Sequence, residues 1–241
     1  MFPLRDNIPT EHFPVVTVAL ILANCFVYFF LQDGFWQLPD GGATGDWPVQ
    51  QYAAIPCEFT GQCQAVGPPS TIVTAFTSMF MHGSLLHLGG NMLFLWIFGN
   101  NVEDSMGPVK FVVFYLLGGL AADAAQILTG PGSDVPTIGA SGAVAAVLGG
   151  YLLLFPRARV VTLVFIVFFF TILELPAILF LGIWIIQQGL FAYFDLLQPA
   201  GGGGGVAYFA HIGGFLFGLL LIRVFASERR RRRQIDRMGV T

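Results

Sequence analysis

Polar side chains within long apolar stretches are the residues of this sequence that could do chemistry, and Ser141 is the first. It lies between Gly139 and Gly142, at the start of an apolar stretch that we predict to be a helix. Glycines on both sides let another chain approach the backbone closely, since they have no Cβ atom. The N-terminus of a helix also offers unpaired N–H groups and a positive dipole end. Alone, however, this pattern is more typical of close helix packing than of catalysis.

His211 is the second such residue, in the segment AHIGGFLFG near the start of the last apolar stretch. Gly214 and Gly218 follow it with the GxxxG spacing that lets membrane helices meet backbone to backbone. The helix that begins at Ser141 has a similar small-residue face, formed by Gly142, Ala146, Gly149 and Gly150. If these faces meet, Ser141 and His211 come together as a nucleophile and its general base. A lone buried histidine would otherwise be read as structural.

His87 and Asn91 are four residues apart, so they lie on the same face of a predicted helix. Both can donate hydrogen bonds, and donors of this kind stabilise the oxyanion in acyl-transfer enzymes. Hydrogen bonding between helices explains the pair equally well at this stage. The remaining polar residues within apolar stretches are His82, Asp123, Gln126, Gln187 and Gln188. For Asp123 a structural role is favoured over a catalytic one.

The composition predicts that membrane helices position these residues. Of the 241 residues, 55% are hydrophobic and only 10% are charged, against about 25% charged in soluble domains. A bilayer core is spanned by about 20 apolar residues, and the sequence offers six apolar helices, of which the fourth is short for a full crossing and would begin below the membrane surface. Their expected ranges are Phe13–Leu31, Met79–Phe98, Val109–Leu128, Ser141–Phe155, Leu175–Phe194 and Tyr208–Phe225.

Two segments between these helices need separate interpretation. Residues 32–70 are rich in Gly, Pro, Asp and Gln, and we expect a large outer loop, where Cys57 and Cys63 could be either a disulfide or two free thiols. The apolar run from Val160 to Phe194 is too long for one crossing. Because Glu174 and Pro176 interrupt it, we interpret residues 160–171 as a surface or re-entrant piece.

The distribution of basic residues predicts the orientation. With six spans, all 11 Lys and Arg residues fall on the side of the two termini, which the positive-inside rule assigns to the cytoplasm. We therefore predict an all-α membrane protein, a six-transmembrane-helix bundle with N and C termini cytoplasmic. Its parts are a short N-terminal cytoplasmic segment (1–12), the transmembrane domain (13–225) with its large first outer loop (32–70), and a basic cytoplasmic tail (226–241).

Three motifs resemble the rhomboid family of intramembrane serine proteases. They are TSMFMHGSLLHLGGNMLFLWIFGNNVED from Thr77, GASGA from Gly139 and AHIGGFLFG from Ala210, and their order and placement in the second, fourth and sixth spans match that family. The similarity covers about Phe13 to Phe225, so a rhomboid-like six-helix bundle is expected. GxSG alone would carry little weight, but the three motifs together are specific.

The resemblance implies a Ser-His dyad without an acidic third member, in which Ser141 is the nucleophile and His211 the general base. His87, Asn91 and the Ser141 N–H would form the oxyanion hole. His82, which matches a histidine just before that pair, and Glu103 would have structural roles. Two departures stand out: Val73 and Thr74 replace a Trp-Arg pair of the outer loop, and Ala145 stands where some members place an aromatic ring against the histidine.

The expected function is therefore that of an intramembrane serine endopeptidase that cleaves transmembrane segments of other membrane proteins. The alternative is a catalytically silent rhomboid-like protein that binds membrane helices, although such relatives normally lose the serine or the histidine. HExxH and an intramembrane GxGD, which metal-dependent and aspartyl intramembrane proteases need, are absent from the sequence, as is CxxC. We expect no metal or cofactor, transmembrane substrates and the lipid bilayer as partners, no nucleic acid, and a bacterial inner membrane as the location; the oligomeric state is not predicted.

Overall fold

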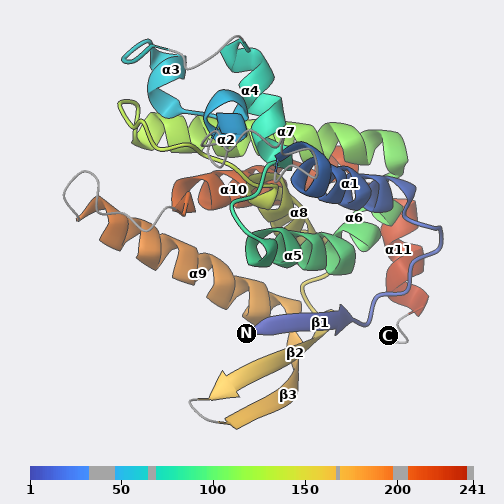
Figure 1. The fold of residues 1–241 in the computed structure, drawn as a ribbon. Helices are drawn as coiled ribbons and strands as arrows, with labels where there is room; N and C mark the ends of the chain where they lie inside the picture. Colours follow the sequence, from blue (N-terminus) through green and yellow to red (C-terminus); the bar gives the residue numbers. More distant parts are fainter. Residues whose placement is uncertain (33–46, 65–68, 167–168, 198–205, 238–241) are drawn as a thin grey trace.

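The computed structural model describes residues 1–32, 47–64, 69–166, 169–197 and 206–237. Helices dominate the fold, and a small sheet extends from one end of the bundle (Figure 1). Four helical segments are long and apolar enough to cross a membrane. They are α1 with its π-helical continuation η1 (Val15–Gln32), α7 (Pro108–Thr129), α9 (Ala177–Leu196) and α10 (Tyr208–Phe225). The count of six spans stays a prediction.

The predicted second span differs most from the structure among the helices. A short 3-10 helix, η2 (Ser78–Phe80), is followed by a break, and the helix itself begins at Leu85 rather than at Met79. The Ser84 hydroxyl accepts a hydrogen bond from the His87 backbone N–H at 3.1 Å and so caps the helix N-terminus. Beyond this cap the chain stays helical through α5 (Leu85–Phe94), the π-helix η3 (Leu95–Gly99) and α6 (Asn100–Met106).

The short helix α8 (Ser141–Leu154) forms the centre of the bundle. Every residue from Gly142 to Tyr151 is buried, as expected for a helix that is apolar on all sides. Helices α5, α7 and α10 surround it (Figure 1). This position places the N-terminus of α8, and with it Ser141, inside the protein.

The all-α expectation is wrong for residues 159–176 and for the N-terminus. Strands β2 (Arg159–Ile166) and β3 (Phe169–Pro176) form an antiparallel hairpin, and β1 (Phe2–Asp6) pairs with β2 on its other side. The predicted surface or re-entrant piece, 160–171, is thus a strand and part of the next. Val, Ile, Thr and Phe dominate this run and favour strands, but a continuous apolar run has no periodicity that separates strand from helix.

Three short helices, two of them from the predicted outer loop, cover the end of the bundle that is opposite to the sheet. Helices α2 (Trp47–Tyr52), α3 (Pro56–Thr60) and α4 (Thr71–Thr77) lie there (Figure 1). Cys57 and Cys63 form a disulfide, which answers a question that the sequence left open. Residues 33–46 and 65–68 of the predicted loop lie outside the described residues.

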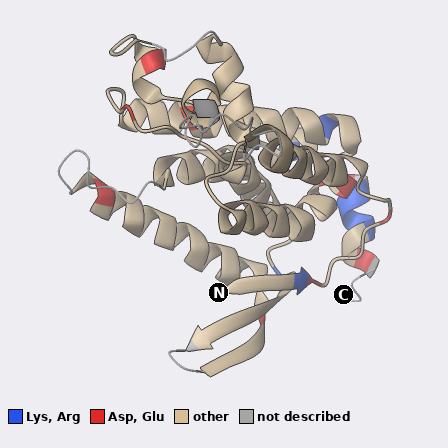
Figure 2. Cartoon of the chain, viewed as in Figure 1, with Lys and Arg blue, Asp and Glu red and all other residues tan. Residues whose placement is uncertain are grey.

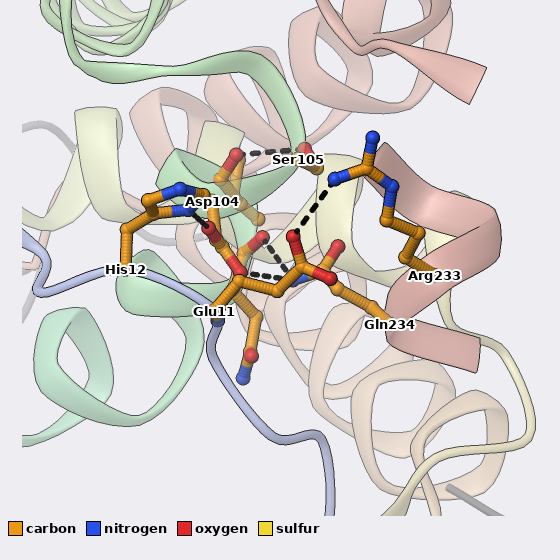
Figure 3. A network of polar contacts seen from close by, with 8 residues as sticks. Glu11, His12, Asp104, Ser105, Arg233 and Gln234 are labelled. Carbon is orange, nitrogen blue, oxygen red and sulfur yellow. Dashed lines mark hydrogen bonds and ion pairs between the residues drawn. The ribbon is translucent and has the colours of Figure 1, made fainter. Parts of the chain in front are cut away.

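The predicted basic tail is a docked helix over part of its length. Helix α11 (Glu228–Arg237) carries the arginine run and lies against α6. Gln234 is fully buried, and its amide donates to Asn101 O and Asp104 Oδ2, both at 3.3 Å. Asp104 also accepts from the Glu11 backbone N–H at 2.6 Å, so one carboxylate joins the N-terminal segment to α11 (Figure 3).

Most charged residues lie away from the buried middle of the bundle, with Asp123 of α7 as an exception. Basic residues lie on β1, at the start of α7 and along α11, whereas the charged residues of α3 and α9 are all acidic (Figure 2). Lys110 donates to Phe225 O at 3.3 Å, which places the start of α7 beside the end of α10. The basic residues of these elements therefore share the end of the bundle at which α10 finishes.

Candidate active site

Ser141 is the first residue of α8, and the backbone before it has a conformation that only glycine adopts readily. Gly139 has φ +121°, a value that side chains with a Cβ rarely take. A Cβ on Gly139 would also lie 2.7 Å from His87 Nε2. The glycine thus lets the His87 ring lie directly over the turn that presents Ser141.

His211 lies within hydrogen-bond reach of Ser141. His211 Nε2 is 2.9 Å from Ser141 Oγ, and the two residues come from α10 and α8. The small-residue faces predicted for these helices bring them together: a Cβ on Gly214 would overlap Gly142 O, and a Cβ on Gly218 would overlap Ala146 O. A hydroxyl and an imidazole in this arrangement can act as a serine nucleophile and its general base.

His87 and Asn91 face the same cavity from α5. The Gly83 backbone N–H donates to His87 Nδ1 at 3.3 Å, so a neutral His87 carries its proton on Nε2, the nitrogen that lies over Gly139. Asn91 is 8% exposed, and its Nδ2 has no hydrogen-bond partner among the described residues. Two N–H donors are therefore left for a ligand that enters beside Ser141.

The cavity at this site has a volume of about 820 Å³. His87, Asn91, Ser141 and His211 all line it, so the structure brings four of the predicted site residues together. Residues of the segments that precede α5, α8 and α10 also line it, among them Gly83, Ile138 and Ala207. The cavity thus lies at the end of the bundle where these three helices begin.

His82 lies behind this cavity, where it is fully buried. The Ala140 backbone N–H donates to His82 Nε2 at 3.4 Å, so the ring supports the turn before Ser141. The Gln32 side chain brackets the His82 backbone, since its Oε1 accepts from His82 N at 2.8 Å and its Nε2 donates to His82 O at 2.5 Å. The residues of η1 thereby hold the segment that leads into α5.

Two residues of α9 contact His211, and the motifs gave no indication of either. The Trp184 ring lies 5.9 Å from the His211 ring, centroid to centroid, at an interplanar angle of 37°. It packs against the imidazole, whereas the predicted position for such a ring holds the small, buried Ala145. Gln188 Oε1 lies 2.8 Å from His211 Nδ1. The one available signal was the polarity of Gln188 within an apolar stretch.

The other intramembrane polar residues lie elsewhere. Gln126 Oε1 accepts from the Ala210 backbone N–H at 3.2 Å, one residue before His211. Asp123 is buried on α7, and its Oδ2 has no hydrogen-bond partner within the described part of the chain. It does not line the cavity. Among the described residues, no three His, Cys, Asp or Glu side chains form a group that could hold a metal ion.

Several curated proteins resemble this chain over much of its length. Yeast Rhomboid protein 1, mitochondrial (Saccharomyces cerevisiae) is 29% identical over 95% of this chain and 62% of its own. The mouse Presenilin-associated rhomboid-like protein, mitochondrial (Mus musculus) is 31% identical over 60% of this chain and 36% of its own. The RHOMBOID-like protein 12, mitochondrial, of Arabidopsis thaliana is 32% identical over 58% of this chain and 43% of its own. This chain therefore spans less than two thirds of each relative.

The names of these relatives contradict one expectation. A bacterial inner membrane was predicted, but all three proteins are named mitochondrial. The prediction was wrong. The distribution of Lys and Arg, which supported the topology, reports the sidedness of a membrane protein. That distribution carries no information on which membrane the protein occupies.

The family model named Rhomboid domain matches residues 69–228. The match runs from just before α4 to the start of α11, and so includes α5, α8 and α10 with His87, Asn91, Ser141 and His211. It covers more than half of the chain. On this evidence the chain belongs to the rhomboid family, whose members are generally intramembrane serine proteases.

Proposed function

We propose that this protein is an intramembrane serine endopeptidase that cleaves transmembrane segments of other membrane proteins. The observation that carries the proposal is the 2.9 Å contact between Ser141 Oγ and His211 Nε2 on the wall of a cavity of about 820 Å³. A silent helix-binding relative would not need this contact.

In the first step, His211 Nε2 accepts the proton of the Ser141 hydroxyl while Oγ attacks the carbonyl carbon of the scissile peptide bond. The tetrahedral intermediate collapses when His211 gives that proton to the leaving amine, and the C–N bond breaks. Water then attacks the acyl-enzyme, and His211 takes its proton and returns one to Ser141 Oγ. The products are a carboxylic acid and an amine, so one water molecule is consumed for each bond.

The oxyanion of the intermediate needs donors that are in place before the reaction. In the proposal, three donors do this: Asn91 Nδ2, His87 Nε2–H and the Ser141 backbone N–H at the first turn of α8. Each such donor is worth about 2.7–4 kcal/mol in comparable enzymes. The unpartnered state of Asn91 Nδ2 supports this role, because a buried donor without a partner costs free energy in the resting protein.

The substrate is a transmembrane segment that unwinds beside the cavity. A helix hides its peptide bonds, so segments with Gly, Ala or Pro near the cut are favoured, and by family resemblance the residue before the cut is small. We propose that the substrate enters between α9 and α5. Phe180 of α9 stacks on Phe94 of α5 with ring centroids 6.3 Å apart, and most other α9 side chains are exposed, as expected of a helix in lipid.

Six spans with both termini on one side remain the proposed topology. The continuous helix from Leu85 to Met106 and the shorter α8 would supply the two spans beyond the four long ones. The proposed transmembrane domain is 13–225, with segments 1–12 and 226–241 at the basic side. The names of its relatives support a mitochondrial membrane as the location.

Cleavage of a model transmembrane substrate in proteoliposomes tests the proposal. The wild type should release two fragments, and Ser141→Ala and His211→Ala should each release none above background. Ser133→Ala, in the loop before α8, is the control and should cleave at the wild-type rate. Full cleavage by Ser141→Ala would overturn the dyad. Absence of cleavage by the wild type across several substrates with small residues would favour the silent, helix-binding alternative.

A further inference from the structure

Helix α9 contacts the rest of the bundle through a single stripe of side chains. Phe180 packs against Phe98, Trp184 against His211 and Phe215, and Phe191 against Tyr208. Together with Gln188, the α9 residues among these recur every three or four positions, so they share one face of the helix. Ala177, Leu181 and Ala192 are buried on the same face, and Gln188 is its polar member, one turn after Trp184 and 8% exposed.

A buried amide on a helix in lipid must find a hydrogen-bond partner, because an unpaired polar group in an apolar medium is costly. Gln188 finds it in His211: its Oε1 lies 2.8 Å from His211 Nδ1. The other ring nitrogen, Nε2, is 2.9 Å from Ser141 Oγ. Ser141, His211 and Gln188 therefore form one line of hydrogen bonds from α8 through α10 to α9.

The amide oxygen fixes the position of the imidazole proton. A carbonyl oxygen only accepts hydrogen bonds, so the partner of Gln188 Oε1 must be an Nδ1–H. In neutral His211 this leaves the lone pair on Nε2, where the Ser141 hydroxyl donates. The opposite tautomer would place an N–H against Ser141 Oγ and could not accept its proton.

We infer that Gln188 is a positioning residue for this reaction, taking through a neutral amide the place that an acidic residue holds in other serine proteases. The inference rests on the proposed function. In triads, replacing the acid by an amide that stabilises the wrong tautomer lowers kcat by about 10⁴-fold. Here the amide presents its oxygen and stabilises the reactive tautomer, and it does so without the cost of burying a carboxylate in the membrane.

Because Gln188 comes from α9, the position of that helix affects His211. The helix contributes Trp184 and Gln188 to the surroundings of His211 through the same stripe that holds it to the bundle. Movement of α9 away from α10 would break the Oε1 to Nδ1 contact. His211 therefore keeps its reactive tautomer only while α9 lies against α10.

Three variants test the role of Gln188 by kinetics in proteoliposomes. Gln188→Met keeps the length of the side chain but removes the acceptor. We expect kcat to fall roughly 10- to 100-fold, which is part of what a general base contributes, while KM stays within about twofold of the wild-type value. Gln188→Glu keeps an acceptor for Nδ1–H and should recover most of that loss. Gln187→Met, at the adjacent exposed position, is the matched control and should behave as the wild type.

A spectroscopic readout separates this inference from the proposed function. The chain has four histidines, so ¹⁵N-histidine labelling gives a simple spectrum, and His211→Ala assigns the signals of His211. The wild type and Gln187→Met should show His211 with its proton on Nδ1, and Gln188→Met should show a mixture of tautomers. This result in a protein that cleaves nothing would show that Gln188 fixes the His211 tautomer and would count against the protease proposal.

Two outcomes would overturn the inference. One is that Gln188→Met retains both the Nδ1–H tautomer and the wild-type kcat. The other is that Gln188→Met and Gln188→Glu lose kcat equally while the tautomer is unchanged, which would make Gln188 a packing residue. Thermal unfolding of each variant in detergent shows whether the compared proteins are equally folded.

Discussion

Gly218 and Ala146 touch backbone to backbone where α10 crosses α8, and a Cβ on Gly218 would overlap the Ala146 carbonyl oxygen. Because the carbonyl belongs to a buried helix, it cannot move aside as the end of a flexible side chain would. The contact is two turns from His211 along α10. Separation of the helices at this point would therefore also lengthen the distance between His211 and Ser141.

We predict that Gly218→Ala lowers both the stability and the activity of the protein. Overpacking of this kind costs about 1–3 kcal/mol, so the midpoint of thermal unfolding in detergent should fall, and cleavage should fall at least tenfold. The control is Gly182→Ala on α9, where a Cβ would have nothing within 4 Å. Alanine is the better helix former by about 1 kcal/mol, so the control should be unchanged or slightly stabilised. Equal effects of the two substitutions would contradict the packing argument.

Asn91→Ala should separate activity from stability. Its Nδ2 has no partner in the resting protein, so removing it should leave the thermal unfolding midpoint unchanged or slightly higher, while kcat falls about 10²- to 10³-fold through loss of an oxyanion donor. Asn101→Ala provides the opposite control. Asn101 Nδ2 donates to Asp6 Oδ2 at 2.6 Å, so this variant should lose stability and keep the kcat of its folded fraction. An Asn91→Ala variant with normal kcat would remove Asn91 from the oxyanion hole.

Glu103 caps the first helix from a distant part of the chain. Its carboxylate accepts from the backbone N–H groups of Val16 at 3.0 Å and Thr17 at 2.8 Å, and from Thr17 Oγ1 at 2.8 Å. Glu103→Ala leaves these buried donors without an acceptor and should cost about 1–3 kcal/mol of stability. Glu174→Ala, which breaks an exposed pair with Arg159 at 3.5 Å, should cost under about 1 kcal/mol. Unfolding in detergent measures both.

Asp6 should make the stability depend on pH. Burial raises the pKa of Asp6 to about 6 from its ordinary value of 3.8, although hydrogen bonds from Tyr151 and Asn101 oppose this rise. The folded protein therefore holds the Asp6 proton more tightly than the unfolded chain does. The resulting stabilisation is fully present below about pH 4 and is lost as the pH rises through about 6.

Asp6→Asn tests this dependence, because an amide does not titrate. Thermal unfolding of the wild type should show a loss of stability between pH 4 and pH 7 that is smaller in Asp6→Asn. Asp236→Asn, at an exposed position on α11, is the control and should keep the wild-type dependence. If the stability of the wild type and of Asp6→Asn changed equally with pH over this range, folding would not raise the pKa of Asp6, and the prediction would be contradicted.

Sequence patterns predicted the helix ends best where a helix is uniformly apolar. The sixth span was predicted as Tyr208–Phe225, and α10 has these bounds; the fourth ends one residue earlier than predicted, at Leu154. The second span was misplaced because its first turn is set by a local cap, in which Ser84 accepts from His87 N–H. Hydropathy does not register such a cap.

The strands could not be recognised for a different reason. Strands β2 and β3 are mostly apolar, and the pairing of β2 with β1 depends on residues more than 150 positions away, as the hydrogen bond from Arg159 N to Asn7 Oδ1 illustrates. A contact of this range leaves no periodic signal in either segment. The same holds for α11, whose docking depends on the buried Gln234 rather than on the conspicuous arginines.

The candidate site also has residues that the sequence indicated and residues that only the structure places. Ser141, His211, His87 and Asn91 carry short motifs, and small residues at regular spacing indicated which helices meet. Trp184 and Gln188 carry no motif, because they act through the face that α9 turns to α10. Only the packed structure assigns them to His211.

Covalent labelling of Ser141 by a fluorophosphonate tests the central claim most directly, because the reagent reacts with an activated serine and needs no knowledge of the substrate. The protein is labelled in liposomes and the modified residue is located by peptide mass spectrometry. The dyad predicts a single adduct on Ser141 in the wild type and in Ser133→Ala, and none in His211→Ala or Ser141→Ala. Labelling of Ser141 that is undiminished in His211→Ala would contradict the account. So would a wild type in which Ser141 stays unmodified, as it does in Asn91→Ala and His211→Ala.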